Sequence, residues 1–121
     1  MAKVTAGDII TEARGLLNDA SAVRWTNAAL FRYIFAGENQ MAGNHPETQL
    51  SDDDTKIDYP TPTLLTQVTD YTTISVEHAK PLVHFVVAQA FLEDADDAGN
   101  LKLADYHLSL YRQFLGDVQV R

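Results

Sequence analysis

The sequence predicts an all-α protein: a small four-helix bundle with a long irregular arm between its second and third helices and an extended C-terminal tail. Four segments carry apolar residues at helical spacing, and helix start and stop signals border them. The chain has 121 residues, of which 45% are hydrophobic, as in an ordinary single globular domain. We therefore expect one helical domain over residues 1–116, with the arm at about 46–75, and a tail over residues 117–121.

Composition excludes several classes of protein. The formal net charge is −8, which is unfavourable for gripping a phosphate backbone that is held mainly by Lys and Arg. The absence of cysteine excludes disulfides, thiolate metal ligands and thiol nucleophiles. No window approaches the ~18 consecutive apolar residues of a membrane helix, and the start, Met1–Thr5, lacks the apolar region of a signal peptide. We expect a soluble intracellular protein that binds neither membranes nor nucleic acid in general.

The first helix is predicted from Ala6 to Asn18. Thr5 is placed as its N-cap, and Val4 and Ile9 are placed as a hydrophobic staple across the helix start. Its apolar face comprises Ile9, Ile10, Ala13, Leu16 and Leu17.

A loop-to-helix junction follows, and it holds the only tryptophan of the chain. Thr26 is placed to cap the second helix, while Trp25 and Leu30 occupy the two positions of a second hydrophobic staple. We interpret Trp25, Thr26 and Leu30 as the structural anchor of the fold, with Trp25 packed against the third or fourth helix. The second helix is predicted from Asn27 to Gly43 or Asn44, because the residue before Pro46 disfavours helical geometry.

Residues 46–75 are the least regular part of the sequence and are interpreted as a projecting arm. Residues 51–54 read as an acidic loop tip. Short alternations at residues 56–59 and 72–76 permit two strands, which Pro60 and Pro62 limit to edge pieces or a loose hairpin.

The last two helices are predicted at residues 77–97 and 100–115, joined by a short link into an antiparallel hairpin. The third helix is apolar nearly all round, which indicates burial on most sides and suggests contacts between subunits. Gly116 is well suited to end the fourth helix. Beyond it, Asp117-Val118-Gln119-Val120-Arg121 alternates like a strand.

Candidate metal sites are incomplete. The segment from Asp94 to Asp105 resembles an EF-hand loop, but Ala98 stands at a ligand position and the last position holds Asp in place of the bidentate Glu. We interpret it as an acidic helix end with a glycine turn. His78 and His84 lie six residues apart, unlike the i, i+4 pair of a helical zinc site, and are expected to be structural or exposed. We expect no metal and no cofactor.

No pattern supports catalysis or sequence-specific DNA binding. The chain has no Gly-x-Ser-x-Gly elbow between a strand and a helix and no glycine loop that would cradle phosphate. A helix-turn-helix needs a turn of about 3–4 residues, and the segment Asp19–Trp25 is longer than that. We therefore predict that the protein is not an enzyme.

Two stretches of the chain together resemble the head–tail connector proteins of tailed bacteriophages, also called adaptor or head-completion proteins. The first comprises Ala13-Arg14, Leu16-Leu17-Asn18-Asp19, Arg24-Trp25-Thr26-Asn27, Leu30 and Tyr33. The second comprises Leu82-Val83, Phe85, Ala90-Phe91-Leu92-Glu93-Asp94, Ala104, Tyr106-His107 and Phe114-Leu115-Gly116. The likeness covers about residues 5–40 and 75–116, and the arm departs from it in length and sequence.

The resemblance implies a structural virion protein at the head–tail interface, present in the host cytoplasm before assembly. Such proteins form a ring, usually a dodecamer, below the portal protein, extend the DNA channel and dock the tail or the next connector. DNA passes through the lumen without specific binding. The resemblance also implies that the tail, here Gly116, Asp117, Val118, Gln119, Val120 and Arg121, reaches the portal. The alternatives are a small helical regulatory or protein-interaction module and, behind it, a calcium-binding or DNA-binding protein.

Overall fold

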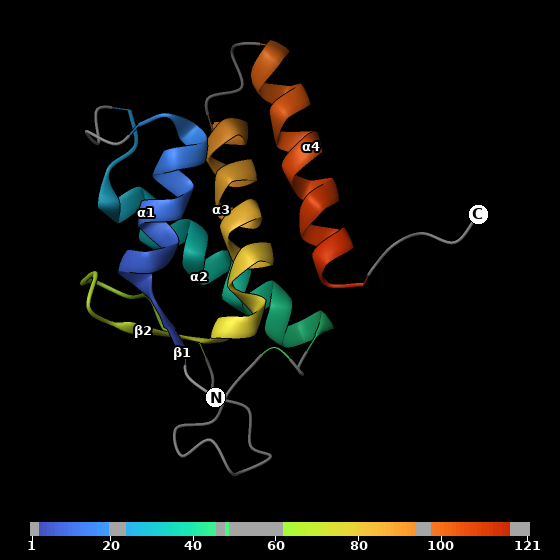
Figure 1. Ribbon diagram of the computed structural model, residues 1–121. Coiled ribbons are helices and arrows are strands. Elements are labelled where there is room, and N and C mark those ends of the chain that lie inside the picture. The colour runs from blue at the N-terminus through green and yellow to red at the C-terminus, as the bar shows by residue number, and fades with distance from the viewer. Residues whose placement is uncertain (1–2, 20–23, 46–47, 49–61, 94–97, 117–121) are drawn as a thin grey trace.

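The computed structural model describes residues 3–19, 24–45, 48, 62–93 and 98–116. The predicted all-α class is confirmed, and a short two-stranded sheet is added to it (Figure 1). The elements are β1 (Lys3–Thr5), α1 (Ala6–Leu17), α2 (Asn27–Asn44), β2 (Tyr71–Ser75), the 3-10 turn η2 (Val76–His78), α3 (Ala79–Glu93) and α4 (Ala98–Phe114).

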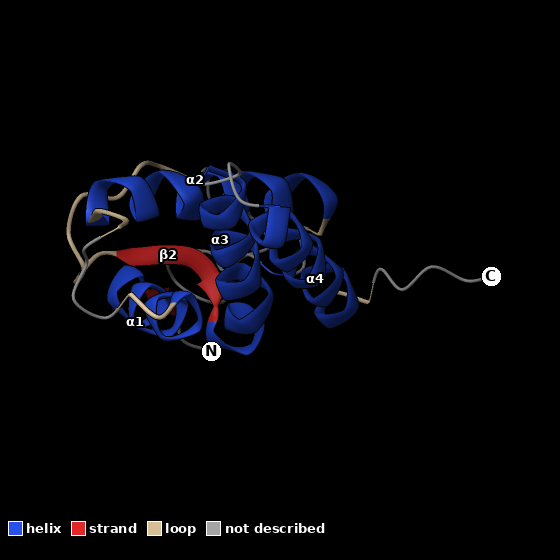
Figure 2. Ribbon diagram, turned by 90° about the horizontal axis from the view of Figure 1, so that it is seen from above, coloured by secondary structure: helices blue, strands red, loops and turns tan. Residues whose placement is uncertain are grey.

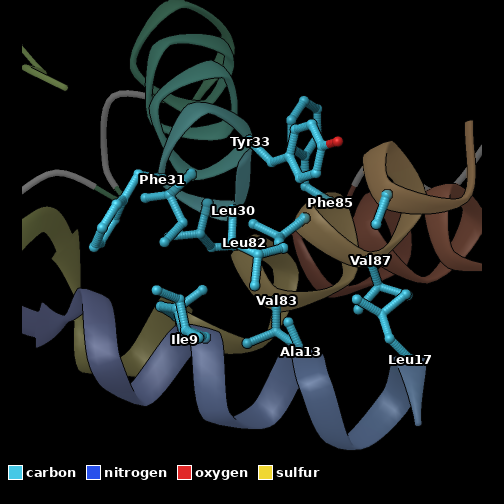
Figure 3. Close-up of a cluster of buried hydrophobic side chains, with 14 of the residues drawn as sticks. Ile9, Ala13, Leu17, Leu30, Phe31, Tyr33, Leu82, Val83, Phe85 and Val87 are labelled. Carbon is cyan, nitrogen blue, oxygen red and sulfur yellow. The ribbon is translucent and has the colours of Figure 1, made fainter. Parts of the chain in front are cut away.

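Helix α3 is the central element of the bundle. It packs against α1, α2 and α4, whereas α4 packs mainly on α3 and lies away from α1 (Figures 1 and 2). In Figure 3, Ile9, Ala13 and Leu17 of α1 lie opposite Val83 and Val87 of α3. Because α3 is covered on three sides within one chain, most of its apolar residues are buried without a second subunit. The buried set is Leu82, Val83, Phe85, Val86, Val87, Ala88, Ala90 and Phe91. Burial within one chain thus accounts for the apolar character of this helix, and the contacts between subunits that it suggested stay a prediction.

Both predicted N-caps are present. The Thr5 Oγ1 accepts a hydrogen bond from the Asp8 N–H at 3.2 Å, and the Thr26 Oγ1 accepts one from the Ala29 N–H at 3.1 Å. Helix α1 ends at Leu17, one residue earlier than predicted, because Asn18 adopts the left-handed conformation (φ 56°) and caps the helix.

The boundaries of the last two helices differ from the prediction. The turn η2 occupies residues 76–78, so α3 begins at Ala79 and Pro81 falls in its first turn, where a missing N–H is tolerated. Helix α3 is described to Glu93, and residues 94–97 lie outside the described part of the chain. Helix α4 begins at Ala98, two residues before the predicted start. Gly116 has φ +80°, which agrees with its predicted role in ending α4.

The sheet corrects the interpretation of the arm. Strand β2 pairs antiparallel with β1, with Lys3 opposite Ser75, so within the described residues its partner is the N-terminal strand. The Thr72 hydroxyl donates to the Val4 carbonyl at 2.9 Å, and Ile74 is fully buried. Tyr71–Ser75 therefore belongs to the body of the domain, and a projecting arm can involve only residues before it. The other predicted strand, residues 56–59, lies outside the described residues.

Gly37 lies at a tight contact between α2 and α3. A Cβ atom at this position would lie 2.6 Å from the Leu82 Cδ1 and 2.9 Å from the Phe85 Cδ1, both buried side chains. The glycine that weakens α2 as an isolated helix is thus what lets the two helices pack closely.

We expect Gly37→Ala to destabilise the protein by about 1–2 kcal/mol, because an overpacking cost of ~1–3 kcal/mol exceeds the gain in helix propensity. The matched control is Gly15→Ala in α1, where the added methyl group meets nothing within 4 Å. That variant should gain about 0.5–1 kcal/mol. Urea denaturation of both variants measures the difference, and a stabilised Gly37→Ala protein would contradict the packing argument.

Candidate functional site

A buried hydrogen-bond network forms the junction between α1 and α2. The Arg14 Nη1 donates to the Asp19 Oδ2 at 3.1 Å and to the Trp25 carbonyl at 2.9 Å, and the Arg14 Nη2 donates to the Asn27 Oδ1 at 2.7 Å. The Asp19 carboxylate also accepts from the backbone N–H groups of Arg24 and Trp25. Both charged side chains are buried. One ion pair therefore holds the end of α1, the returning loop and the start of α2 together.

Trp25 lies next to this network, with its ring in the core. Its indole N–H donates to the Ala90 carbonyl at 3.2 Å, and its ring meets Phe91 edge to face at 6.3 Å between centroids. Both partners are on α3, which is one of the two helices against which Trp25 was predicted to pack. Leu30, the second residue of the staple, is fully buried. On the outer side, the Arg24 guanidinium lies 4.9 Å from the centre of the indole.

A polar pair closes the same junction at the end of α3. The Tyr33 hydroxyl donates to the Glu93 Oε1 at 3.1 Å. Burial, followed by this hydrogen bond and the carboxylate charge, raises the pKa of Tyr33 to about 12. The phenol therefore stays protonated and holds α2 to α3 throughout the physiological pH range.

Two histidines from different helices, His84 of α3 and His107 of α4, meet at the α3–α4 interface. The Nδ1 atoms of His84 and His107 lie 2.9 Å apart, so one ring donates to the other. Burial lowers the pKa of His84 to about 4, with His107 and Lys80 as smaller causes, and burial also lowers the pKa of His107. Both rings are thus neutral at pH 7. The Phe114 ring stacks on His84 at 5.5 Å between centroids.

A groove runs beside this pair on the outer side of α3. Its volume is about 400 Å³, and its lining residues are Glu12, Gly15 and Leu16 of α1 and Lys80, Val83 and His84 of α3. A second groove of about 620 Å³ lies between the first half of α2 and residues 64–68. Neither groove brings together the nucleophile, base and oxyanion donors that a catalytic site requires.

Glu38 of α2 is the most unusual carboxyl in the described structure. Its side chain is 1% exposed, and its Oε2 accepts hydrogen bonds from the N–H and the hydroxyl of Thr73 in β2, at 2.8 and 3.2 Å. Its Oε1 is buried without a hydrogen-bond partner. Burial raises the pKa of Glu38 to about 7, although the two hydrogen bonds from Thr73 oppose the shift.

The remaining predicted sites divide between described and undescribed residues. Among the described residues, no group of three or more His, Asp or Glu side chains could hold a metal ion. Three positions of the EF-hand-like segment, Asp94, Asp96 and Asp97, lie outside the described part, as do residues 117–121 of the proposed portal-docking tail. Within the described ranges, no helix combines the length and hydropathy that a membrane-spanning segment requires.

Comparison with known proteins returned no matching family model, no matching curated protein and no matching solved structure. The function of this chain must therefore be argued from its own residues.

Sequence reasoning missed three of these features. The burial of the Arg14–Asp19 pair was not predicted, because charged residues are ordinarily expected to be exposed. The His84–His107 contact depends on the relative rotation of α3 and α4. Glu38 lies in the first two-thirds of a helix whose apolar stripe includes its neighbours Ile34 and Met41. Glu38 lies four residues after Ile34 and three residues before Met41, and this position within the buried stripe was the one signal that could have revealed its burial.

Proposed function

We propose that this chain is a head–tail connector of a tailed bacteriophage, a structural and non-enzymatic virion protein that extends the DNA channel under the portal and docks the tail. The proposal starts from the resemblance of two stretches to that class of protein. Its main support is that residues of the first stretch contact one another: Arg14, Asp19 and Trp25 form a buried hydrogen-bond network, to which the exposed Asn27 is joined through Arg14. If the resemblance were a coincidence, the residues that carry it would not be expected to hydrogen-bond to one another.

The second stretch supports the proposal in the same way. Its residues form the α3–α4 hairpin, with His107 against His84 and Phe114 closing the contact. Helix α4 is followed by Gly116, the residue that precedes the proposed portal-docking segment, residues 117–121. A compact bundle that ends in a short tail suits a protein that is placed on a larger ring and anchored by its end.

The charge of the chain is compatible with a channel. A net charge of −8 on each copy gives a ring a strongly negative field, which repels the DNA backbone and lets it slide without specific binding. The described residues offer no basic stripe of the kind that nucleic-acid-binding domains carry.

A small protein-interaction module is the second candidate, and the groove of about 620 Å³ on α2 favours it. Its lining includes the exposed side chains of Leu64 and Val68, which an apolar peptide could cover. A module of this kind would act free in the cell, whereas a connector is part of the particle.

Deletion of residues 117–121 tests the connector proposal. The truncated protein should keep its melting temperature, because the backbone entropy lost on ordering a five-residue terminal segment limits what it can add to stability, but it should no longer dock onto portal-bearing capsids. The measurement is co-sedimentation of purified protein with tailless heads, followed by cryo-EM of the neck. As a control, Val118→Thr and Val120→Thr together keep the tail length while removing its apolar side chains.

Full docking by the truncated protein would show that the tail is not the portal anchor. Absence of the intact chain from the neck of mature particles would overturn the connector proposal itself and favour the interaction module.

A further inference from the structure

The groove between α2 and residues 64–68 is apolar and carries one charged side chain. Its described lining is Asn27, Ala28, Phe31 and Arg32 of α2 together with Leu64, Leu65, Thr66 and Val68. Phe31 is buried and lies on the side of α2 that faces away from Tyr33 (Figure 3). Leu64 and Val68 are 52% and 44% exposed. The groove, of about 620 Å³, therefore presents apolar side chains to solvent in a concave site.

The irregular wall of the groove leaves main-chain groups without partners. Residues 62–66 belong to no helix or strand. The N–H groups of Thr66 and Gln67 donate to the Asp70 carboxylate, at 3.2 and 3.1 Å, so this acid is engaged by its own loop. Among the described residues, the main chain of residues 63–65 has no hydrogen-bond partner. Such N–H and carbonyl groups are available to the main chain of a bound peptide.

Arg32 gives the groove a positive charge. Its side chain is exposed, and within the described part of the chain its guanidinium forms no ion pair and no hydrogen bond. The described lining contains no Asp or Glu, and the first turn of α2 contains none either. The site is thus locally positive in a chain whose net charge is −8. A guanidinium at this place matches a carboxylate that is attached to an apolar segment.

A neighbouring pocket of about 260 Å³ continues this positive surface. Arg32 lines it as well, and Arg24 is its second cation. Glu93 is the acid of that pocket, and its Oε1 accepts the hydrogen bond from the Tyr33 hydroxyl. The charge balance of the described lining is therefore positive on both sides of Arg32, which favours an acidic ligand.

We propose that the groove binds a segment of another protein that carries apolar side chains next to an Asp or Glu. The main chain of the segment pairs with residues 63–65, its apolar side chains cover Phe31, Leu64 and Val68, and its carboxylate meets the Arg32 guanidinium. A fatty acid also combines an apolar chain with a carboxylate, but it cannot use the main-chain groups. The inference names the ligand of the groove that favours the interaction module, so it rests on that second candidate function.

Selection of short random peptides by mRNA display on the immobilised chain tests the ligand class. Peptides enriched on the wild-type chain should share an Asp or Glu beside apolar residues. Selection on Arg32→Glu should replace that acid with Lys or Arg, because the variant reverses the charge that the ligand meets. Arg112→Glu is the matched control: it makes the same change at an exposed position of α4 outside the groove and should leave the wild-type preference intact.

Fluorescence anisotropy of the most enriched peptide, labelled with fluorescein, then gives dissociation constants. Arg32→Glu and Leu64→Ser should each raise the constant at least about tenfold, since one reverses the charge and the other removes an apolar contact. Leu101→Ser controls for the second change, because Leu101 lies on α4 outside the groove and is 46% exposed, against 52% for Leu64. It should alter the constant less than about twofold. Circular dichroism checks that the variants remain folded.

Three results would overturn the proposal. They are enrichment of no acidic motif on the wild-type chain, equal binding of the selected peptide by wild type and Arg32→Glu, and tighter binding of laurate than of any selected peptide, measured by displacement. The last result would assign the groove to a fatty acid. The interaction module itself fails by a different observation, the presence of the chain in the neck of mature particles.

Discussion

Replacing Arg14 with alanine is expected to destabilise the protein by about 3–5 kcal/mol, because it leaves a buried carboxylate without its counter-charge. The Asp19 carboxylate and the Arg14 guanidinium lie 3.1 Å apart, and their side chains are 5% and 8% exposed. The substitution also removes the donors to the Trp25 carbonyl and the Asn27 side chain. For a chain of this length the expected total stability is roughly 6–18 kcal/mol, so this loss is a large share of it.

A double-mutant cycle separates the ion pair from the rest of the network. Asp19→Ala alone should also cost about 3–5 kcal/mol, whereas the double variant should cost clearly less than the sum, since neither charge is then left unpaired. Arg24→Ala is the control: it removes an exposed cation that contacts the Trp25 ring and should cost about 1 kcal/mol or less. Chemical denaturation followed by Trp25 fluorescence provides the measurement. Additive losses would mean that the two side chains act independently.

The parts of the fold that were predicted correctly depend on local chemistry. Thr5 and Thr26 cap their helices because each stands directly before a helix. From there its hydroxyl reaches the N–H groups of the first turn, which have no partner within the helix. Gly116 ends α4 because the positive φ there suits a residue without Cβ. The all-round apolar character of α3 predicted burial on most sides, and most of its apolar residues are buried. In each case the feature is determined by residues that are close together in the sequence.

The parts that were missed depend on distant residues. Strand β1 has three residues, too few for an alternation to be recognised, and it forms only because residues near position 73 return to pair with it. The role of Gly37 cannot be predicted from α2 alone, since the Leu82 and Phe85 side chains that require a glycine there belong to another helix. The network of Arg14 was missed for the same reason: its partners lie up to 13 positions away. Sequence patterns report local preference, whereas these contacts are decided by tertiary packing.

Changing Glu38 to glutamine should make the protein more stable above pH 7. Burial raises the pKa of Glu38 to about 7 from the ordinary value of 4.5, which a glutamate carboxyl has in the unfolded chain. Between these values the native state holds a proton that the unfolded state has released, so the Glu38 contribution to stability falls as pH rises and levels off above pH 7. The full change is at most about 3 kcal/mol, at 1.36 kcal/mol for each pH unit. Glutamine remains neutral and should remove this part of the pH dependence.

The difference between Glu38→Gln and wild type isolates this one group from the other carboxyls. The two proteins should be about equally stable near pH 5, where Glu38 is protonated in the folded protein. The variant should be more stable by up to about 3 kcal/mol at pH 8. The acceptor bonds from Thr73 are available to the glutamine oxygen, and its N–H group takes the position of Oε1, which has no partner in either protein. Glu12→Gln, an exposed carboxyl on α1, controls for the change in net charge. Urea denaturation at pH 5, 6, 7 and 8 gives the difference in unfolding free energy between variant and wild type at each pH. A difference that stays constant with pH would mean that Glu38 is ionised in the folded protein throughout. Its charge would then be stabilised by a group other than Thr73.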